Sequence, residues 1–303
     1  RGMEQRPDIL CIGSVLWDII GRAVVHMRAG SDVPGRIERL PGGVAMNIAM
    51  TLTRFGLRPA ILTAIGRDSQ GADLIQAAEV MGIDCAYLYR SEDLPTDRYM
   101  AIEGANGLIA AIADAHSLEQ AGDKILRPLS DGRLGSASAP WSGPIALDGN
   151  LTQALLSEIA ASALFAAADL RVAPASPGKA ERLAPLMRHP RATLYVNLEE
   201  AGILCQRDFA SAEAAARGLI ERGAGRVLVT DGGRAAADGI RGPGGPEVIS
   251  AAPPPVLVTR VTGAGDTFMA AHLVAEREGC PRGPALERAL KAAARYVSGE
   301  SAS

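Results

Sequence analysis

Short, continuous apolar runs alternate along the chain with longer segments in which apolar residues recur every three or four positions. Ile9–Leu16 is the first such run, and it is typical of a strand buried on both faces in a parallel sheet. Pro59–Gly66, Ser69–Met81 and Cys85–Tyr89 follow in the order strand, helix, strand. This alternation continues to the end of the chain, and it predicts an α/β fold with a mostly parallel central sheet and helices on both faces.

Two pairs of short alternating segments interrupt this order. The first pair lies within residues 19–40, and the second is joined by Asn106 and Gly107, a dipeptide that strongly favours a tight hairpin turn. They predict a small β-sheet that projects from the core, although periodicity also allows edge strands of the main sheet. The expected division is a core of residues 3–20, 41–95 and 115–303 and a small sheet of residues 21–40 and 96–114.

Residues 256–276 carry the strongest chemical signal. The short apolar run Val256–Val258 predicts a strand, and Gly263 and Gly265 predict a tight turn into a helix. Backbone N–H groups at such a helix start bind anions, and glycine lets a phosphate come close. Asp266 would repel a phosphate here, so this residue either accepts the proton of an attacking hydroxyl or caps the helix.

Polar residues near other predicted elements suit a sugar ligand. Asp18 follows the first apolar run, and a carboxylate beyond the carboxyl end of a parallel strand can accept protons from two neighbouring hydroxyls. Gly42 and Gly43 permit close backbone approach, and Asn47, which opens a predicted helix to Arg54, can donate to and accept from hydroxyls. The structural alternatives are turns at the glycines and caps at the polar residues.

Two further candidate sites follow predicted strands. Asn197 and Glu200 have the spacing of a capping box, in which each side chain accepts from a backbone N–H of the other residue. The predicted strand Arg226–Thr230 ends in an Asp-Gly-Gly turn that includes Gly232. The sequence has no Walker-type loop and no dinucleotide fingerprint, which disfavours a Rossmann-type dehydrogenase and leaves the turn at Gly263 as the phosphate candidate.

Composition narrows the class of partner. The chain has 303 residues, 48% of them hydrophobic, and a formal net charge of −3. These values predict a globular protein that binds neither a nucleic acid polymer nor an anionic membrane. Four cysteines without a CxxC spacing indicate free thiols, and the sequence lacks a signal-peptide layout and a membrane-spanning run, so we expect a cytoplasmic location. The four histidines form no metal-binding spacing, and we interpret them as surface or helix residues.

Two separate motifs resemble the signatures of the ribokinase, or PfkB, family of carbohydrate and nucleoside kinases. The run VTGAGDTF is similar to the C-terminal signature, and PGGVAMNIAMTLTRFG, from Pro41 to Gly56, is similar to the N-terminal one. The resemblance covers essentially the whole chain. It implies a ribokinase-like three-layer sandwich, a small sheet that acts as a lid over the sugar, a homodimer formed through this lid, and phosphate transfer from ATP with Mg²⁺.

The resemblance also implies roles for individual residues. Asp266 is the expected base, and the expected backbone donors to the transferred group are Gly263, Ala264 and Gly265. The expected substrate residues are Asp18, Gly42, Gly43 and Asn47, together with Thr96, Arg98 and Tyr99 on the second lid hairpin. The expected nucleotide residues are Asn197, Thr230, Gly232 and Gly265, and Asn197 and Glu200 are expected to organise Mg²⁺ through water.

Arg260 departs from the family pattern. Many members have an Asp three residues before the first signature glycine, often tied to a potassium site, so the arginine puts a monovalent-cation requirement in doubt. This departure and the segments TDRYMAIEGANGLIAAIADA, VAPASPGKA and VNLEEAGIL are similar to pseudouridine kinases. The expected reaction is therefore phosphorylation of the 5′-hydroxyl of a ribosyl substrate, with pseudouridine as the first candidate. The alternatives are a ribokinase, a fructokinase, another nucleoside kinase, or a regulator that binds a sugar or nucleotide without catalysis.

Overall fold

The computed structural model describes residues 5–300, so the predicted core limits at residues 3 and 303 lie outside the described residues. An eight-stranded sheet forms the centre of the molecule. In spatial order its strands are β14 (Gly245–Ala251), β13 (Ala236–Gly242), β12 (Arg226–Thr230), β11 (Ala192–Asn197), β10 (Asp169–Val172), β9 (Pro144–Leu147), β1 (Ile9–Ile12) and β4 (Pro59–Leu62). Neighbours from β12 to β4 are parallel, and β13 and β14 are antiparallel. The predicted mostly parallel sheet is confirmed.

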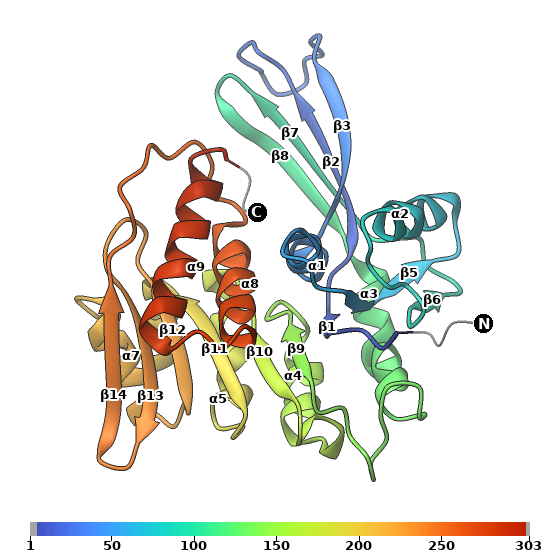
Figure 1. Ribbon diagram of the computed structural model, residues 1–303. Helices are drawn as coiled ribbons and strands as arrows, with labels where there is room; N and C mark the ends of the chain where they lie inside the picture. The colour runs from blue at the N-terminus through green and yellow to red at the C-terminus, as the bar shows by residue number, and fades with distance from the viewer. Residues whose placement is uncertain (1–4, 301–303) are drawn as a thin grey trace.

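Helices cover both faces of this sheet (Figure 1). One face packs against α1 (Val44–Arg54), α8 (Ala264–Arg277) and α9 (Arg282–Val297), and the other packs against α4 (Gln153–Ala161), α5 (Ala184–Met187), α6 (Leu198–Cys205) and α7 (Ala212–Glu221). Successive residues of a strand enter different cores, because Ile9 and Cys11 join one buried cluster while Leu10 and Ile12 join the other. The three-layer arrangement therefore follows from strands that are apolar on both faces.

The remaining elements flank this core. They are α2 (Ser69–Val80), α3 (His116–Ala121), the 3₁₀ segments η1 (Gly122–Leu129), η2 (Ala163–Phe165) and η3 (Pro177–Leu183), and the parallel pair β5 (Ala64–Gly66) and β6 (Tyr89–Ser91). Within residues 5–300, no helix combines the length and the apolar character needed to cross a lipid bilayer.

A second sheet projects from the core on the side where α8 begins and α9 ends (Figure 1). Its four strands, in spatial order, are β3 (Arg36–Gly42), β2 (Leu16–Arg22), β7 (Arg98–Gly104) and β8 (Gly107–Asp114). Among the described residues none of these strands pairs with the eight-stranded sheet, so they form a small sheet of their own, as predicted, and are not edge strands of the main sheet. We refer to these four strands as the lid sheet.

The structure departs from the sequence prediction in several short segments. The predicted strand Ile9–Leu16 ends at Ile12, and Leu16 begins β2, so Asp18 lies within a strand of the lid sheet and not just beyond the first parallel strand. Val256–Val258 forms no strand, and its three side chains are exposed. Pro253–Pro255 precedes it, and proline removes the backbone N–H groups that a strand needs. In Cys85–Tyr89 only the last residue enters a strand, because the backbone at Asp84 makes an isolated bridge with Ala60 before the chain turns. Apolar character alone does not supply a pairing partner.

Candidate active site

The turn before α8 forms an open helix start. Gly263 is the N-cap residue with φ 92°, a left-handed conformation that glycine adopts without strain. Asp266 lies in the first turn of α8, and the N-cap position belongs to Gly263 and not to this aspartate. The N–H groups of a first helical turn lack intrahelical acceptors, and the positive end of the helix dipole lies there. The start of α8 is therefore suited to hold a phosphate.

The carboxylate of Asp266 is partly buried beside two polar side chains. Burial raises its pKa to about 7, the negative charge of Asp148 adds to the rise, and a hydrogen bond from the Asn47 side chain opposes it. Both effects that raise the pKa disfavour the charged form of an acid. At neutral pH this carboxyl group is consequently close to the balance between its protonated and ionised forms, which is the condition that suits a general base.

Asp148 is a member of this cluster that the sequence analysis missed. It follows β9, is 1% exposed, and its Oδ2 accepts from the Ser14 backbone N–H at 3.0 Å. Its Oδ1 accepts from the Asn150 backbone N–H at 2.8 Å. Burial raises the pKa of Asp148 as well. The rule that singled out Asp18, a carboxylate just beyond a parallel strand, also applies to Asp148 and was the available signal.

The first turns of α1 place the sugar candidates next to Asp266. α1 begins at Val44 with Gly43 as N-cap, and the Asn47 N–H donates to the Gly43 carbonyl at 2.8 Å, so Asn47 lies inside the helix and does not cap it. Gly43 has φ 93°, and a Cβ there would lie 2.3 Å from the Ser14 carbonyl oxygen. A side chain at Gly43 would therefore collide with the backbone that follows β1.

Asp18 joins the same group through Gly42. A Cβ at Gly42 would lie 2.1 Å from Asp18 Oδ2, so the glycine lets this carboxylate rest against the backbone before α1. Burial raises the pKa of Asp18. The structure therefore brings together five of the predicted residues, at the edge where β1 and β9 end: Asp18, Gly42, Gly43, Asn47 and Asp266.

The three predicted residues of the second lid hairpin have different environments. Tyr99 is in register with Asp18 on the neighbouring strand, so both side chains lie on the same face of the lid sheet. Arg98 precedes it, lies on the opposite face, and pairs with Asp114 at 3.5 Å. Thr96 is fully buried, and its hydroxyl donates to Asp68 Oδ1 at 2.6 Å. Only Tyr99 of these three shares a face with Asp18, and we do not propose Arg98 or Thr96 as substrate contacts.

The predicted nucleotide residues lie at the ends of two neighbouring strands. Asn197 and Thr230 are register partners at the carboxyl ends of β11 and β12. Gly232 follows with φ 56°, and a Cβ there would meet open space. The carboxyl ends of β11 and β12 lie at the same edge of the sheet as the start of α8, and β11 packs against α8. The arrangement fits a nucleotide whose phosphates reach the start of α8.

Asn197 and Glu200 form the capping box of α6. Asn197 Oδ1 accepts from the Glu200 N–H and Glu200 Oε1 accepts from the Asn197 N–H, both at 2.8 Å. Burial raises the pKa of Glu200 to about 7. Within residues 5–300 no three His, Cys, Asp or Glu side chains cluster as a metal site. The described side chains therefore form no dedicated protein cage for a metal ion.

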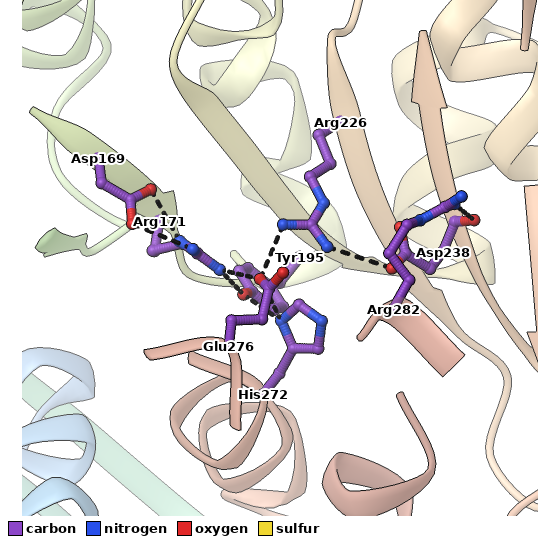
Figure 2. A network of polar contacts seen from close by, with 8 residues as sticks. All are labelled: Asp169, Arg171, Tyr195, Arg226, Asp238, His272, Glu276 and Arg282. Carbon is purple, nitrogen blue, oxygen red and sulfur yellow. Dashed lines mark hydrogen bonds and ion pairs between the residues drawn. The ribbon is translucent and has the colours of Figure 1, made fainter. Parts of the chain in front are cut away.

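A buried network of charged and polar side chains holds α8 against the sheet, as Figure 2 shows. Glu276 Oε1 accepts from Arg171 Nη1 at 2.6 Å and from Arg226 Nη1 at 2.7 Å. Three arginines face three carboxylates in this network, so its charge is balanced when the histidine is neutral. The members are Asp169, Arg171, Tyr195, Arg226, Asp238, His272, Glu276 and Arg282. They come from β10, β11, β12, β13, α8 and α9.

His272 is a helix residue, which the sequence interpretation allows, and it lies at the centre of this network and not at the surface. The ring is 0% exposed, and its Nδ1 lies 2.7 Å from the Tyr195 hydroxyl. Burial lowers the pKa of His272 to about 3, so the ring is neutral at physiological pH. His189 is 7% exposed and lies outside every helix, so the interpretation as a surface or helix residue is wrong for it. The network thus fixes the second half of α8, whose first turn carries Asp266.

Comparison with known proteins identifies a family for this chain. Residues 6–303 match the model of the pfkB family of carbohydrate kinases. The chain is similar to the pseudouridine kinase of Escherichia coli, at 29% identity over 37% of this chain and 36% of that protein, and to the fructoselysine 6-kinase of the same organism, at 25% identity over 84% and 89%. Three of the curated relatives are matched over only 31 to 36% of their own length.

Among solved structures, the fold is similar to the Arabidopsis thaliana ribokinase complexed with ribose and ATP. The TM-score is 0.76 at 20% identity, over 98% of this chain and 95% of that one. The ribokinase-like architecture expected from the two signatures is therefore confirmed, and the family match extends over nearly the whole chain. The chain belongs to the pfkB family of carbohydrate kinases.

Proposed function

We propose that this protein is an ATP-dependent kinase that transfers a phosphoryl group to the primary hydroxyl of a ribosyl substrate. The observation that carries the proposal is the position of Asp266. This carboxylate lies in the first turn of a helix whose start suits a phosphate, and it also contacts Asn47 and neighbours Asp148. A base between an anion site and a group of hydroxyl-binding residues is the arrangement that phosphoryl transfer to an alcohol needs.

Each residue has a distinct part in this reaction. Asp266, with a pKa of about 7, accepts the proton of the attacking hydroxyl. The backbone N–H groups of Gly263 and Gly265 stabilise charge on the transferred group, whereas the N–H of Ala264, which was also expected to be a donor, already bonds to the Val261 carbonyl at 3.0 Å. Asp18 and Asn47 bind the hydroxyls of the sugar and hold the reacting oxygen near Asp266, which removes much of the entropic cost of the encounter.

ATP and Mg²⁺ complete the proposed site. The adenine nucleotide would lie along the edge formed by Asn197, Thr230 and Gly232, and its phosphates would reach Gly265. Mg²⁺, bound with ATP, would offset charge on the phosphates, and Glu200 would act on it through water, as the resemblance implies. We expect no potassium requirement, because Arg260 already directs a fixed positive charge at the carbonyl oxygens of Tyr296 and Glu300.

Pseudouridine is the acceptor we propose first. The sequence segments named above and the similarity to a pseudouridine kinase support it, and Tyr99 offers an aromatic surface on the Asp18 face of the lid sheet. A ribokinase, a fructokinase or another nucleoside kinase is the alternative within the family, and the match to a fructoselysine kinase shows how varied the acceptors of similar proteins are. A regulator without catalysis is disfavoured because Asp266 and its glycines are in place.

A homodimer through the lid sheet and a cytoplasmic location are part of the proposal. The lid face opposite Asp18 exposes apolar side chains: Ile37 at 80%, Ile112 at 68%, Met100 at 45% and Ile102 at 40%. Exposed apolar patches of this kind are typical of association sites. The cysteines within the described residues are free, which fits a reducing compartment. Ile37→Glu with Ile112→Glu should shift the sedimentation of a dimer to that of a monomer, and unchanged sedimentation would exclude this interface.

The decisive experiment for the proposed function is an acceptor screen. The protein, with ATP and Mg²⁺, is assayed on pseudouridine, uridine, adenosine, ribose and fructose, and kcat/KM is measured for each. We expect the highest value for pseudouridine, whose N1–H can meet an acceptor that uridine would leave unpaired. Equal or lower efficiency on pseudouridine would favour the generic sugar or nucleoside kinase, and no transfer to any acceptor would favour the regulator.

A further inference from the structure

The segment that leads into α8 buries few of its apolar side chains. Residues 252–262 form neither helix nor strand, and four of their apolar side chains are exposed: Val256 at 41%, Leu257 at 83%, Val258 at 57% and Val261 at 70%. A segment without buried apolar contacts is held mainly by its polar contacts. The phosphate-binding turn at Gly263 follows directly, so these polar contacts decide how firmly the turn is placed.

Those contacts converge on the C-terminal end of α9. The N–H groups of Thr259 and Arg260 both donate to the Val297 carbonyl, at 2.7 and 3.1 Å. The guanidinium of Arg260 donates from Nε to the Tyr296 carbonyl at 2.6 Å and from Nη2 to the Glu300 carbonyl at 3.0 Å. The last carbonyls of a helix lack intrahelical donors and carry the negative end of its dipole, so a cation is stabilising there.

Arg260 uses backbone carbonyls where an arginine ordinarily pairs with an acid. Within residues 5–300 its guanidinium forms no ion pair with a carboxylate side chain, and it lies 3.9 Å from the centroid of the Tyr296 ring. The hydrogen bonds to the two carbonyls orient the guanidinium plane, and its packing on the Tyr296 ring fixes its distance from the ring. The side chain thus places a positive charge at the C-terminal end of α9.

Tyr296 connects this cation to the phosphate-binding turn. Its hydroxyl donates to the Thr262 carbonyl at 2.5 Å, and a Cβ on Gly263 would lie 2.4 Å from the same hydroxyl. The ring that Arg260 covers therefore touches the backbone of the two residues before Ala264. Moving the ring moves the turn, and with it the N–H groups of the first turn of α8.

We propose that Arg260 is a positioning residue for the phosphate-binding turn and acts through Tyr296. Its guanidinium fixes the Tyr296 ring at the end of α9, and the ring fixes the Thr262 carbonyl and the Gly263 backbone, so that the N–H groups of Gly265 and Asp266 face the transferred phosphoryl group. This inference rests on the proposed phosphoryl transfer. The rest of α8 is held separately, by Glu276 and the network in Figure 2.

The test compares Arg260→Ala with Arg295→Ala, a matched control in which the lost arginine is exposed and lies next to Tyr296 on the same helix. Arg260→Ala should lower kcat about 10- to 100-fold, because displacement of donors by an ångström has effects of this size, with KM values for ATP and acceptor changed less than about threefold. Guanidinium ion at millimolar concentration should restore part of kcat in Arg260→Ala and none in the control. Arg260→Lys should keep more activity than Arg260→Ala.

Hydrogen exchange supplies a readout that needs no catalysis. Arg260→Ala should speed amide exchange in a peptide that covers residues 259–266 and leave residues 268–277 unchanged, and Arg295→Ala should change neither. This pattern in a protein without kinase activity would keep the placement of the turn by Arg260 and Tyr296 and remove the proposed function. Unchanged exchange at residues 259–266 in Arg260→Ala would overturn the inference. So would a loss of kcat that accompanies a fall in Tm, is not restored by added guanidinium ion and is equally large in Arg260→Lys.

Discussion

Asp266→Asn should make the folded protein more stable at pH 8 than the wild type, although it removes the proposed base. The pKa of this carboxyl group is raised from 3.8 to about 7, so the fold favours its protonated form. An acid with a raised folded pKa contributes full stability below its unfolded pKa and loses this contribution as the pH rises through the folded pKa. Asparagine does not titrate and keeps an oxygen that can accept from Asn47.

The pKa values set the size of the effect. At about 1.4 kcal/mol for each pH unit, the loss between pH 3.8 and pH 7 amounts to roughly 4 kcal/mol. Between pH 5 and pH 8 the wild type should therefore lose about 2 to 3 kcal/mol of unfolding free energy relative to Asp266→Asn. Solvent that reaches this partly exposed carboxylate reduces the figure, so it is an upper range.

Urea unfolding of both proteins at pH 5, 6, 7 and 8 measures the difference directly. Other titrating groups are common to the two proteins and cancel in the comparison. Asp73→Asn is the matched control, because Asp73 lies exposed on α2 in a surface pair with Arg39, outside the cluster of Asp266. A stability difference between wild type and Asp266→Asn that is the same at pH 5 and pH 8 would refute the reasoning about burial and Asp148.

Three further variants probe the same site and its support. Asp148→Asn removes a charge that raises the pKa of Asp266, so the acidic limb of the kcat profile should move to lower pH; a fixed midpoint would show that the two carboxyl groups are uncoupled. Asp18→Ala should raise the acceptor KM by about 5- to 150-fold, the equivalent of ~1–3 kcal/mol. The KM for ATP is the internal control, and a change in ATP binding alone would show that the sugar site is assigned to the wrong residues. Glu276→Ala leaves two largely buried arginines without their shared acceptor and should lower the unfolding free energy by about 3 kcal/mol or more. Glu278→Ala removes an exposed pair with Arg288 and should have a much smaller effect; equal effects in chemical denaturation would contradict the role given to the network.

Much of the architecture and site could be predicted because the signals are local. The apolar runs that become β1 and β12, and the glycine turn before α8, each lie within a few consecutive residues, and the paired signatures connect Asn47 with Asp266 across the chain. Val256–Val258 has the same local signal as a strand, yet no neighbour pairs with it in the fold. The strand prediction is wrong here because a strand forms only where a second segment is available to pair with it.

The residues that were missed depend on contacts between distant parts of the chain. Asp148 joins the site because β9 pairs with β1, which lies more than 100 residues earlier in the sequence. His272 becomes neutral and buried because Tyr195, Arg171 and Arg226 surround it from three strands. No periodicity in α8 distinguishes this histidine from one at the surface. Such roles follow from sheet order, which a single sequence does not contain.

The most direct test of the account is the rate of phosphoryl transfer in a single turnover, measured by rapid quench with ATP and Mg²⁺ bound and acceptor saturating, from pH 5.5 to pH 9. For the wild type we predict a rate that rises about tenfold for each pH unit and levels off above about pH 7, as Asp266 ionises. For Asp266→Asn we predict a folded protein that binds ATP and transfers phosphate at least ~10²-fold more slowly, without this dependence. Transfer by the variant within tenfold of the wild type, or a wild-type rate that does not change with pH, would contradict the assignment of Asp266 as the base.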